Sequence, residues 1–268
     1  MLLIGGNTYP DSGPAEAYEA EIDTNVSASY MEGFQFERLW ASQGTLTGQE
    51  DVEDAINTGA GFIHMAGHAN PSILVTFPPN DPDKEHKITI LRMYTFPPLD
   101  AMYALITGRF SEIFSKLMLP INPKLDNNEK LPIVLVGGCH NSQFNTTLLN
   151  MVTHGINYAY GRGLHVPKCW SWWLTSHENG GAIATLGNTG LGMGLPGFDY
   201  PNGLDGWLYP RFFYNYRQLG MEHVGEAHSA AIADYINEFN INMDGEDRQM
   251  VQQWALLGDP SLMIGGYQ

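Results

Sequence analysis

The sequence contains little of several residue types, and each shortage excludes a class of function. Only two of its 268 residues are cysteine, Cys139 and Cys169, and no Cys-x-x-Cys pair occurs. A disulfide framework and a structural zinc site are therefore excluded. Lysine and arginine total 13 against 29 aspartates and glutamates, a formal net charge of −16. Such a chain lacks the basic surface that nucleic acid or an anionic membrane requires of a partner. No apolar run is long enough to span a bilayer.

Short apolar segments bounded by turn residues predict the strands of a core. They lie at residues 2–5, 36–40, 61–65, 133–136, 181–186 and 261–264. Helices are predicted at residues 15–32, 49–57, 101–117, 147–155, 169–176, 209–219, 225–238 and 248–257, and a long Pro-rich loop at 71–87. Alternating strands and helices are typical of an α/β fold with a mainly parallel sheet. We expect a single domain over residues 1–268, and the sequence leaves open whether a prodomain or subdomain precedes it.

Cys139 is the most informative residue of the chain. Residues 132–138 contain four consecutive aliphatic residues between Pro132 and a Gly-Gly pair, which predicts a buried strand that stops at this cysteine. In an open α/β sheet the carboxyl ends of the strands line the ligand crevice. We therefore interpret Cys139 as a nucleophile. A small buried thiol and a disulfide with Cys169 are the structural alternatives.

His68 is the matching candidate for a general base. Residues 61–67 predict a second buried strand, which runs directly into this histidine. A thiol and an imidazole at the ends of two strands are the two parts of an activated cysteine. Two other histidines fit less well. His64 lies inside its strand and so points to a face of the sheet, and His140 follows Cys139 directly, so that the side chains of Cys139 and His140 should diverge. The backbone amides of Cys139 and of the segment after the second strand are candidate oxyanion donors.

Two further patterns are given weaker functional interpretations. Residues 192–197 match Gly-x-Gly-x-x-Gly after a strand, but Pro196 lies inside the match and no helix follows it. We interpret this segment as the wall of a substrate pocket rather than as a dinucleotide site. A metal cluster of His64, His68 and His140 is a minor alternative, because no carboxylate is suitably placed by the sequence to complete it.

Three sets of segments resemble the gingipain-like cysteine peptidases, family C25 of the caspase-like clan CD. The first is the strand that ends in Gly67-His68, and the second is the strand that ends at Cys139 and continues as His-Asn. The third comprises residues 178–190 and the closing Leu-Leu-Gly-Asp-Pro-Ser-Leu-Met-Ile of residues 256–264. In order and spacing these segments cover nearly the whole chain. The resemblance implies a caspase-like three-layer sandwich, a mainly parallel sheet flanked by helices.

The resemblance also implies an activity and the residues that carry it. The chain would be an endopeptidase that forms an acyl-enzyme on Cys139, with His68 as general base and leaving-group acid. Backbone amides of Ala69 and Cys139 would form the oxyanion hole. The resemblance implies that no cofactor is required and that the substrates are proteins or peptides. It is compatible with calcium as a structural ion, for which the sequence identifies no ligands. It also implies a secreted protein that works outside the cell or at its surface.

The sequence departs from the family pattern at several positions. Ala69 stands where the family has glycine after the histidine. Asn7 stands near the place of the carboxylate that orients the family's histidine, with Asp11 as an alternative. Glu19 or Glu21 corresponds to the acidic residue that binds Arg or Lys, which suggests cleavage after basic residues. A sortase-like transpeptidase and a degenerate module that only binds peptides remain rival interpretations.

Overall fold

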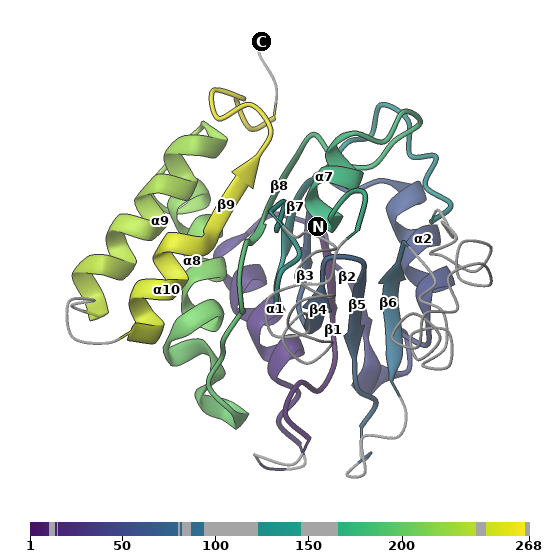
Figure 1. Ribbon diagram of the computed structural model, residues 1–268, viewed down its shortest axis with the longest axis horizontal. Coiled ribbons are helices and arrows are strands. Elements are labelled where there is room, and N and C mark those ends of the chain that lie inside the picture. Colours follow the sequence, from purple (N-terminus) through teal and green to yellow (C-terminus); the bar gives the residue numbers. More distant parts are fainter. Residues whose placement is uncertain are drawn as a thin grey trace, which may run out of the picture.

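A six-stranded sheet forms the centre of the molecule (Figure 1). The computed structural model describes residues 1–10, 14, 16–79, 81, 87–93, 123–145, 166–239 and 245–265. The strands run in the spatial order β2-β1-β3-β7-β8-β9, and all are parallel except β9, which is antiparallel to β8. Their bounds are β1 Leu2–Gly5, β2 Glu37–Trp40, β3 Phe62–Met65, β7 Ile133–Val136, β8 Ala184–Asn188 and β9 Trp254–Leu257.

Helices cover both faces of this sheet, because the central strands are apolar on both sides. Along β7, Ile133 and Leu135 pack into one core cluster, and Val134 and Val136 pack into the other. This alternation is the period of two expected for a strand buried on both faces. The first face is covered by α1 Glu19–Tyr30, α8 Leu204–Arg217, α9 Val224–Phe239 and α10 Gly245–Gln253, and the second by α2 Gln49–Thr58 and α7 Trp170–Thr175 (Figure 1).

A second, smaller sheet packs over the face that carries α2. It is antiparallel and consists of β4 His68–Asn70, β5 Ile73–Thr76 and β6 Ile88–Arg92. The inner residues of β5 and β6 join the core that α2 and α7 cover. The expectation of one long loop over residues 71–87 is therefore wrong at its start. Asn70 explains the difference, since its Oδ1 accepts the Ser72 amide at 2.9 Å and tightens a hairpin turn.

The mainly parallel sheet flanked by helices confirms the predicted α/β class. The prediction of a helix over residues 248–257 is wrong in its second half, where β9 pairs with β8 and buries Trp254. Residues 261–264 are not a strand and make only a single bridge, between His223 and Met263. The predicted helices at 101–117 and 147–155 lie outside the described residues.

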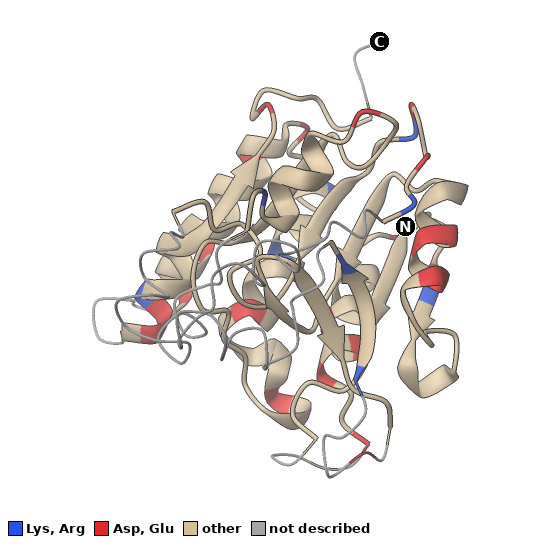
Figure 2. Ribbon diagram, turned by 45° about the vertical axis from the view of Figure 1, so that its right-hand side comes forward, with Lys and Arg blue, Asp and Glu red and all other residues tan. Residues whose placement is uncertain are grey.

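Charge is distributed as the composition predicts. Acidic residues are spread over helices and loops of the described chain, and basic residues are sparse (Figure 2). Within the same residues, no helix has the length and apolar character needed to cross a membrane.

Candidate active site

The loop after β7 presents Cys139 at the carboxyl end of the sheet. Gly137 and Gly138 follow the strand, and Gly138 has φ +99°, a backbone conformation that favours glycine. Cys139 is half-buried, and its Sγ lies 3.5 Å from the Gly192 carbonyl oxygen. Cys139 and Cys169 are both free thiols, so the disulfide alternative is excluded.

Two buried asparagines fix the shape of this loop. The Asn141 side-chain amide donates to the carbonyls of Val136 and Gly138, both at 2.9 Å, and its Oδ1 accepts the Asn188 backbone amide at 2.9 Å. Asn188 in turn donates its side-chain amide to the Gly138 carbonyl at 3.1 Å. Both asparagines are fully buried. Sequence reasoning missed them, although the polar run directly after a buried strand was a usable signal for Asn141.

The cysteine loop and the histidine segment touch through their backbones. A Cβ atom added to Gly138 would lie 2.4 Å from the Gly67 oxygen and 3.1 Å from the Ala69 nitrogen. Only glycine permits so close an approach. The structure thus brings together the two strand ends that the sequence singled out. It also places the Ala69 amide, one of the predicted oxyanion donors, against the loop that carries the other, the Cys139 amide.

His68 is the first residue of β4 and is held by the loop after β1. Its Nε2 lies 2.8 Å from the Thr8 carbonyl oxygen, and its ring contacts the edges of Tyr9 and Phe77, with centroids 6.1 and 5.8 Å away. The base-orienting role that we expected of Asn7 or Asp11 stays a prediction. The backbone of Asn7 pairs with Phe77, and its buried Oδ1 makes no hydrogen bond among the described residues. The alternative, Asp11, lies outside them.

Glu19 and Glu21 point into the protein, where each has partners. One Glu19 oxygen accepts the amides of Thr8 and Tyr9 at 3.0 and 3.2 Å, and the other accepts the Gly197 amide at 2.9 Å. Glu21 accepts the amide and the hydroxyl of Ser42 at 2.8 and 2.5 Å. A role for either carboxylate in binding a basic substrate side chain stays a prediction.

Glu19 and His68 meet at a single peptide group. The carbonyl between Thr8 and Tyr9 contacts His68 Nε2, and the amide of the same peptide donates to Glu19. A carboxylate bonded to the N–H of a peptide polarises it and strengthens its carbonyl as an acceptor. Glu19 therefore acts on the histidine through one peptide unit, a role that no feature of the sequence pattern indicates.

The surroundings of Cys139 favour the neutral thiol. Burial raises its pKa to about 11, nearby Asp205 adds to this effect, and the hydrogen bond to the Gly192 backbone opposes it. Asp205 is itself buried and accepts the Asn188 side-chain amide at 2.9 Å, and its own pKa lies well above the usual range, chiefly because of burial. Burial also raises the pKa of Tyr9 to about 12, with contributions from Asp205 and Cys139. A resting neutral thiol requires a base to become a nucleophile.

His64 is not available to serve as that base. Its Nδ1 lies 2.9 Å from the Ser27 hydroxyl and its Nε2 3.4 Å from an Asp23 oxygen, and the His64 and Asp23 side chains are 0% and 1% exposed. The ring stacks on Tyr209, with centroids 5.9 Å apart. His64 thus faces the layer of helices, as its position inside the strand predicts. Within the described part of the chain, no three His, Cys, Asp or Glu residues form a group that could hold a metal ion.

The segment 192–197 lies against the cysteine loop, as its interpretation as a wall near the substrate requires. A Cβ atom on Gly192 would lie 2.7 Å from the Gly138 carbonyl carbon. Gly197 begins a short 3-10 helix and donates its amide to Glu19. No long helix starts here, which is consistent with rejecting a dinucleotide site.

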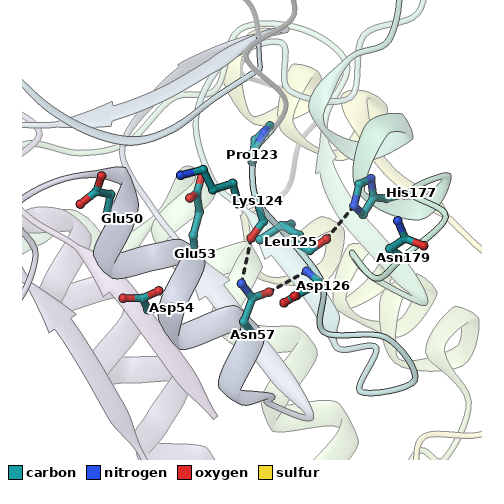
Figure 3. A pocket seen from close by; sticks show the side chains of 10 residues that line it. All are labelled: Glu50, Glu53, Asp54, Asn57, Pro123, Lys124, Leu125, Asp126, His177 and Asn179. Carbon is teal, nitrogen blue, oxygen red and sulfur yellow. Dashed lines mark hydrogen bonds between the residues drawn. The ribbon is translucent and has the colours of Figure 1, made fainter.

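Two cavities among the described residues differ in the charge of the side chains that line them. The first, of about 390 Å³, lies along α2 and is rich in carboxylates, among them Glu50, Glu53, Asp54 and Asp126 (Figure 3). Asn57 and His177 hold its far wall by hydrogen bonds to the backbone of residues 124–126 (Figure 3). The second, of about 470 Å³, has His68 in its wall.

Comparison with known proteins identifies the family of this chain. The model of peptidase family C25 matches residues 1–265, so the chain belongs to that family. Among solved structures it is similar to the Arg-specific cysteine proteinase gingipain R, at 12% identity and a TM-score of 0.52 over 98% of this chain and 46% of that one. It is similar, too, to a complex of the pro- and mature domains of RgpB from Porphyromonas gingivalis, at 13% identity and TM-score 0.53 over 98% and 47% of the two chains. A structure described only as a protease gives 15% identity and TM-score 0.54 over 98% and 48%.

These likenesses establish the caspase-like α/β fold that the sequence predicted, and a cysteine peptidase framework. The chain spans just under half the length of each of these solved structures. Among proteins of curated function, none matches the sequence.

Proposed function

We propose that this chain is a cysteine endopeptidase in which Cys139 is the nucleophile and His68 the general base. The observation that carries the proposal is the direct backbone contact between Gly138, next to the thiol, and the segment of Gly67 and Ala69, on both sides of the imidazole. Membership of peptidase family C25 supports the reaction class.

The proposed reaction proceeds in two halves. His68 takes the proton of the Cys139 thiol, and the sulfur attacks the peptide carbonyl to give a tetrahedral oxyanion next to the amides of Cys139 and Ala69. The C–N bond then breaks, and His68 gives the proton to the leaving amine, which leaves a thioester on Cys139. In the second half, His68 takes a proton from water and the hydroxide adds to the thioester carbonyl. The C–S bond then breaks, His68 returns the proton to the Cys139 sulfur, and the acid product leaves.

Covalent labelling tests the nucleophile without knowledge of the natural substrate. A peptidyl ketone with a leaving group should add one equivalent of mass at Cys139 in the wild type. Cys139→Ala should abolish the labelling, and His68→Ala should slow it by at least about 100-fold, the usual contribution of a general base. Cys169→Ala is the matched control, since that thiol is buried and should not matter. An unlabelled wild-type protein would favour the peptide-binding module and overturn the proposal.

We further propose that the enzyme prefers Arg or Lys before the cleaved bond, in keeping with the net charge of −16 and with the Arg specificity of gingipain R. Fluorogenic peptides that differ only at that residue provide the test, and equal rates for basic and neutral residues would refute the preference. Repeating the assay with an added amine distinguishes hydrolysis from transpeptidation, because a sortase-like enzyme would yield the amide product.

A further inference from the structure

The cavity beside His68 is built on the outer face of the small sheet. Cross-strand partners share a face, and the pairing places His68 opposite Val75, and Val75 opposite Thr89. The adjacent row consists of Asn70, Ile73 and Arg92. The bulge between Leu74 and Val75 keeps both rows on the same face. Phe77 and Lys87 complete the lining of the cavity, whose volume is about 470 Å³.

This cavity differs in charge from the rest of the molecule. Its described lining contains two cationic side chains, Arg92 and Lys87, and no carboxylate. In a chain with 29 acidic and 13 basic residues such a site is unusual, and the cavity along α2 has the opposite character. Within the described residues, no carboxylate lies within 4.0 Å of either cation.

The two cations come from the two ends of β6: Lys87 directly precedes the strand and Arg92 is its last residue. Arg92 is half-buried at the end of β6, where its backbone amide donates to the Gln49 side chain at 2.8 Å. The Lys87 ammonium lies 5.8 Å from the centre of the Phe77 ring, which in turn contacts His68. Arg92 and Lys87 therefore line opposite ends of the cavity, and either one offers a cation that can pair with a carboxylate inside it.

The place of the cavity in the reaction follows from His68. The imidazole must protonate the leaving amine, so the leaving-group half of the substrate lies on the histidine side of the thiol. His68 is part of the cavity wall and Cys139 is not. The cavity therefore faces the part of the substrate that follows the cleaved bond.

We propose that this cavity binds a carboxylate in the leaving-group half of the substrate. The inference rests on the proposed peptidase function and adds a substrate class to it. The carboxylate has two sources, the side chain of an aspartate or glutamate shortly after the cleaved bond, or the free C-terminus of a short leaving peptide.

A peptide mixture of defined composition tests the proposal and separates the two sources. Bonds cleaved by the wild-type protein are identified by mass spectrometry, and the best peptides are resynthesised in two matched forms. In one form the acidic residue becomes its amide, Asp to Asn or Glu to Gln, and in the other the C-terminal acid becomes an amide. The change that removes the bound carboxylate should lower kcat/KM by roughly two- to five-fold, the range for partly exposed charge pairs. The preference should weaken as salt is added.

Variants of the cavity complete the test. Arg92→Gln and Lys87→Gln should each abolish part of the preference, and Arg92→Lys should retain most of it. Arg38→Gln is the matched control, because it removes the same charge from β2, away from the cavity. Arg38→Gln should label at the wild-type rate with the peptidyl ketone, which occupies only the acyl half of the site.

The outcomes separate this inference from the proposed function. If the wild-type protein is neither labelled nor active, the peptidase proposal fails and this inference with it. If labelling and cleavage are normal but acid and amide peptides react equally, or Arg92→Gln behaves like Arg38→Gln, only the carboxylate site is refuted.

Discussion

The cysteine loop and the histidine segment are held in different ways. The cysteine loop is enclosed by backbone: Gly138 has no room for a side chain, and the fully buried Asn141 and Asn188 bind its carbonyls. Among the described contacts of His68, its Nε2 lies at the Thr8 carbonyl oxygen and its ring packs at a steep angle against Tyr9 and Phe77, at the margin of a small sheet. The position of the thiol is thus set by close packing, whereas the orientation of the imidazole depends on a few polar contacts. Substitutions in the first region should affect folding, and those in the second should affect reactivity.

The largest effect should come from Gly138→Ala. Its Cβ would lie 2.4 Å from the Gly67 oxygen, and the residue has φ +99°, so both the contact and the backbone oppose a side chain. We expect a loss of about 2–4 kcal/mol in the free energy of unfolding, measured by urea denaturation. Gly61→Ala is the control, since nothing lies within 4 Å of its added Cβ. Equal stability of the two variants would contradict close packing between Gly138 and the segment of Gly67 and Ala69.

The next effect should come from Asn141→Ala. The change leaves buried carbonyls of the loop and the Asn188 amide without their partner. We expect the free energy of unfolding to fall by roughly 2–3 kcal/mol, the cost of leaving buried polar groups unsatisfied. Thermal unfolding measures the loss, and Asn202→Ala, an exposed asparagine bonded only to Asp199, serves as control. A wild-type midpoint for Asn141→Ala would show that the loop needs no side-chain support.

Glu19→Gln tests the histidine side of the comparison. The variant keeps the volume of the side chain but removes the charge that polarises the peptide between Thr8 and Tyr9. We expect about 1–2 kcal/mol of destabilisation and a roughly ten-fold slower labelling of Cys139, which is equivalent to about 1.4 kcal/mol in the barrier.

Glu21→Gln is the matched control for this prediction. It changes another buried carboxyl group of the same helix, whose described hydrogen-bond partner is Ser42 and not the Thr8–Tyr9 peptide. Its destabilisation should be similar, but labelling should keep the wild-type rate. If both variants slowed labelling equally, the slower rate would result from the lower stability of the fold and not from a change in the orientation of the His68 imidazole.

The smallest effect concerns the pH dependence of the thiol. The folded pKa of about 11 lies above the ordinary value of 9.0, so the folded thiol keeps its proton between these values while an unfolded one loses it. Protons bound in excess by the folded state make stability fall as pH rises, here through the window from about 9 to about 11. Alkylation of Cys139 by iodoacetamide should likewise continue to accelerate above pH 9. Asp205→Asn should lower the pH midpoint of the alkylation rate. An unchanged pH profile would exclude Asp205 as a cause of the raised pKa of Cys139.

The sequence alone could predict the elements that have a simple period. The aliphatic runs of β1, β3 and β7 predicted buried parallel strands, and their ends predicted where Cys139 and His68 meet. It could not predict that Trp254–Leu257 is a strand, because its partner β8 is distant in sequence and tertiary pairing overrides helical propensity. Neither could it predict the contacts of Thr8, Glu19 or Asn188, because a carbonyl or a buried polar side chain leaves no periodic signal.

The order of the strands in the sheet bears on when the cysteine acquires its surroundings. Ile133 pairs with Ala184, and Asn188, which binds the Gly138 carbonyl, pairs in turn with Trp254. Contacts between residues so far apart in sequence form late, because the closure of long loops must come first. A ribosome-bound chain that has emerged only as far as Cys139 already carries the thiol but none of these contacts. We therefore expect newly made protein to pass through a stage in which Cys139 is present and inert, and to become reactive only as its C-terminal third docks.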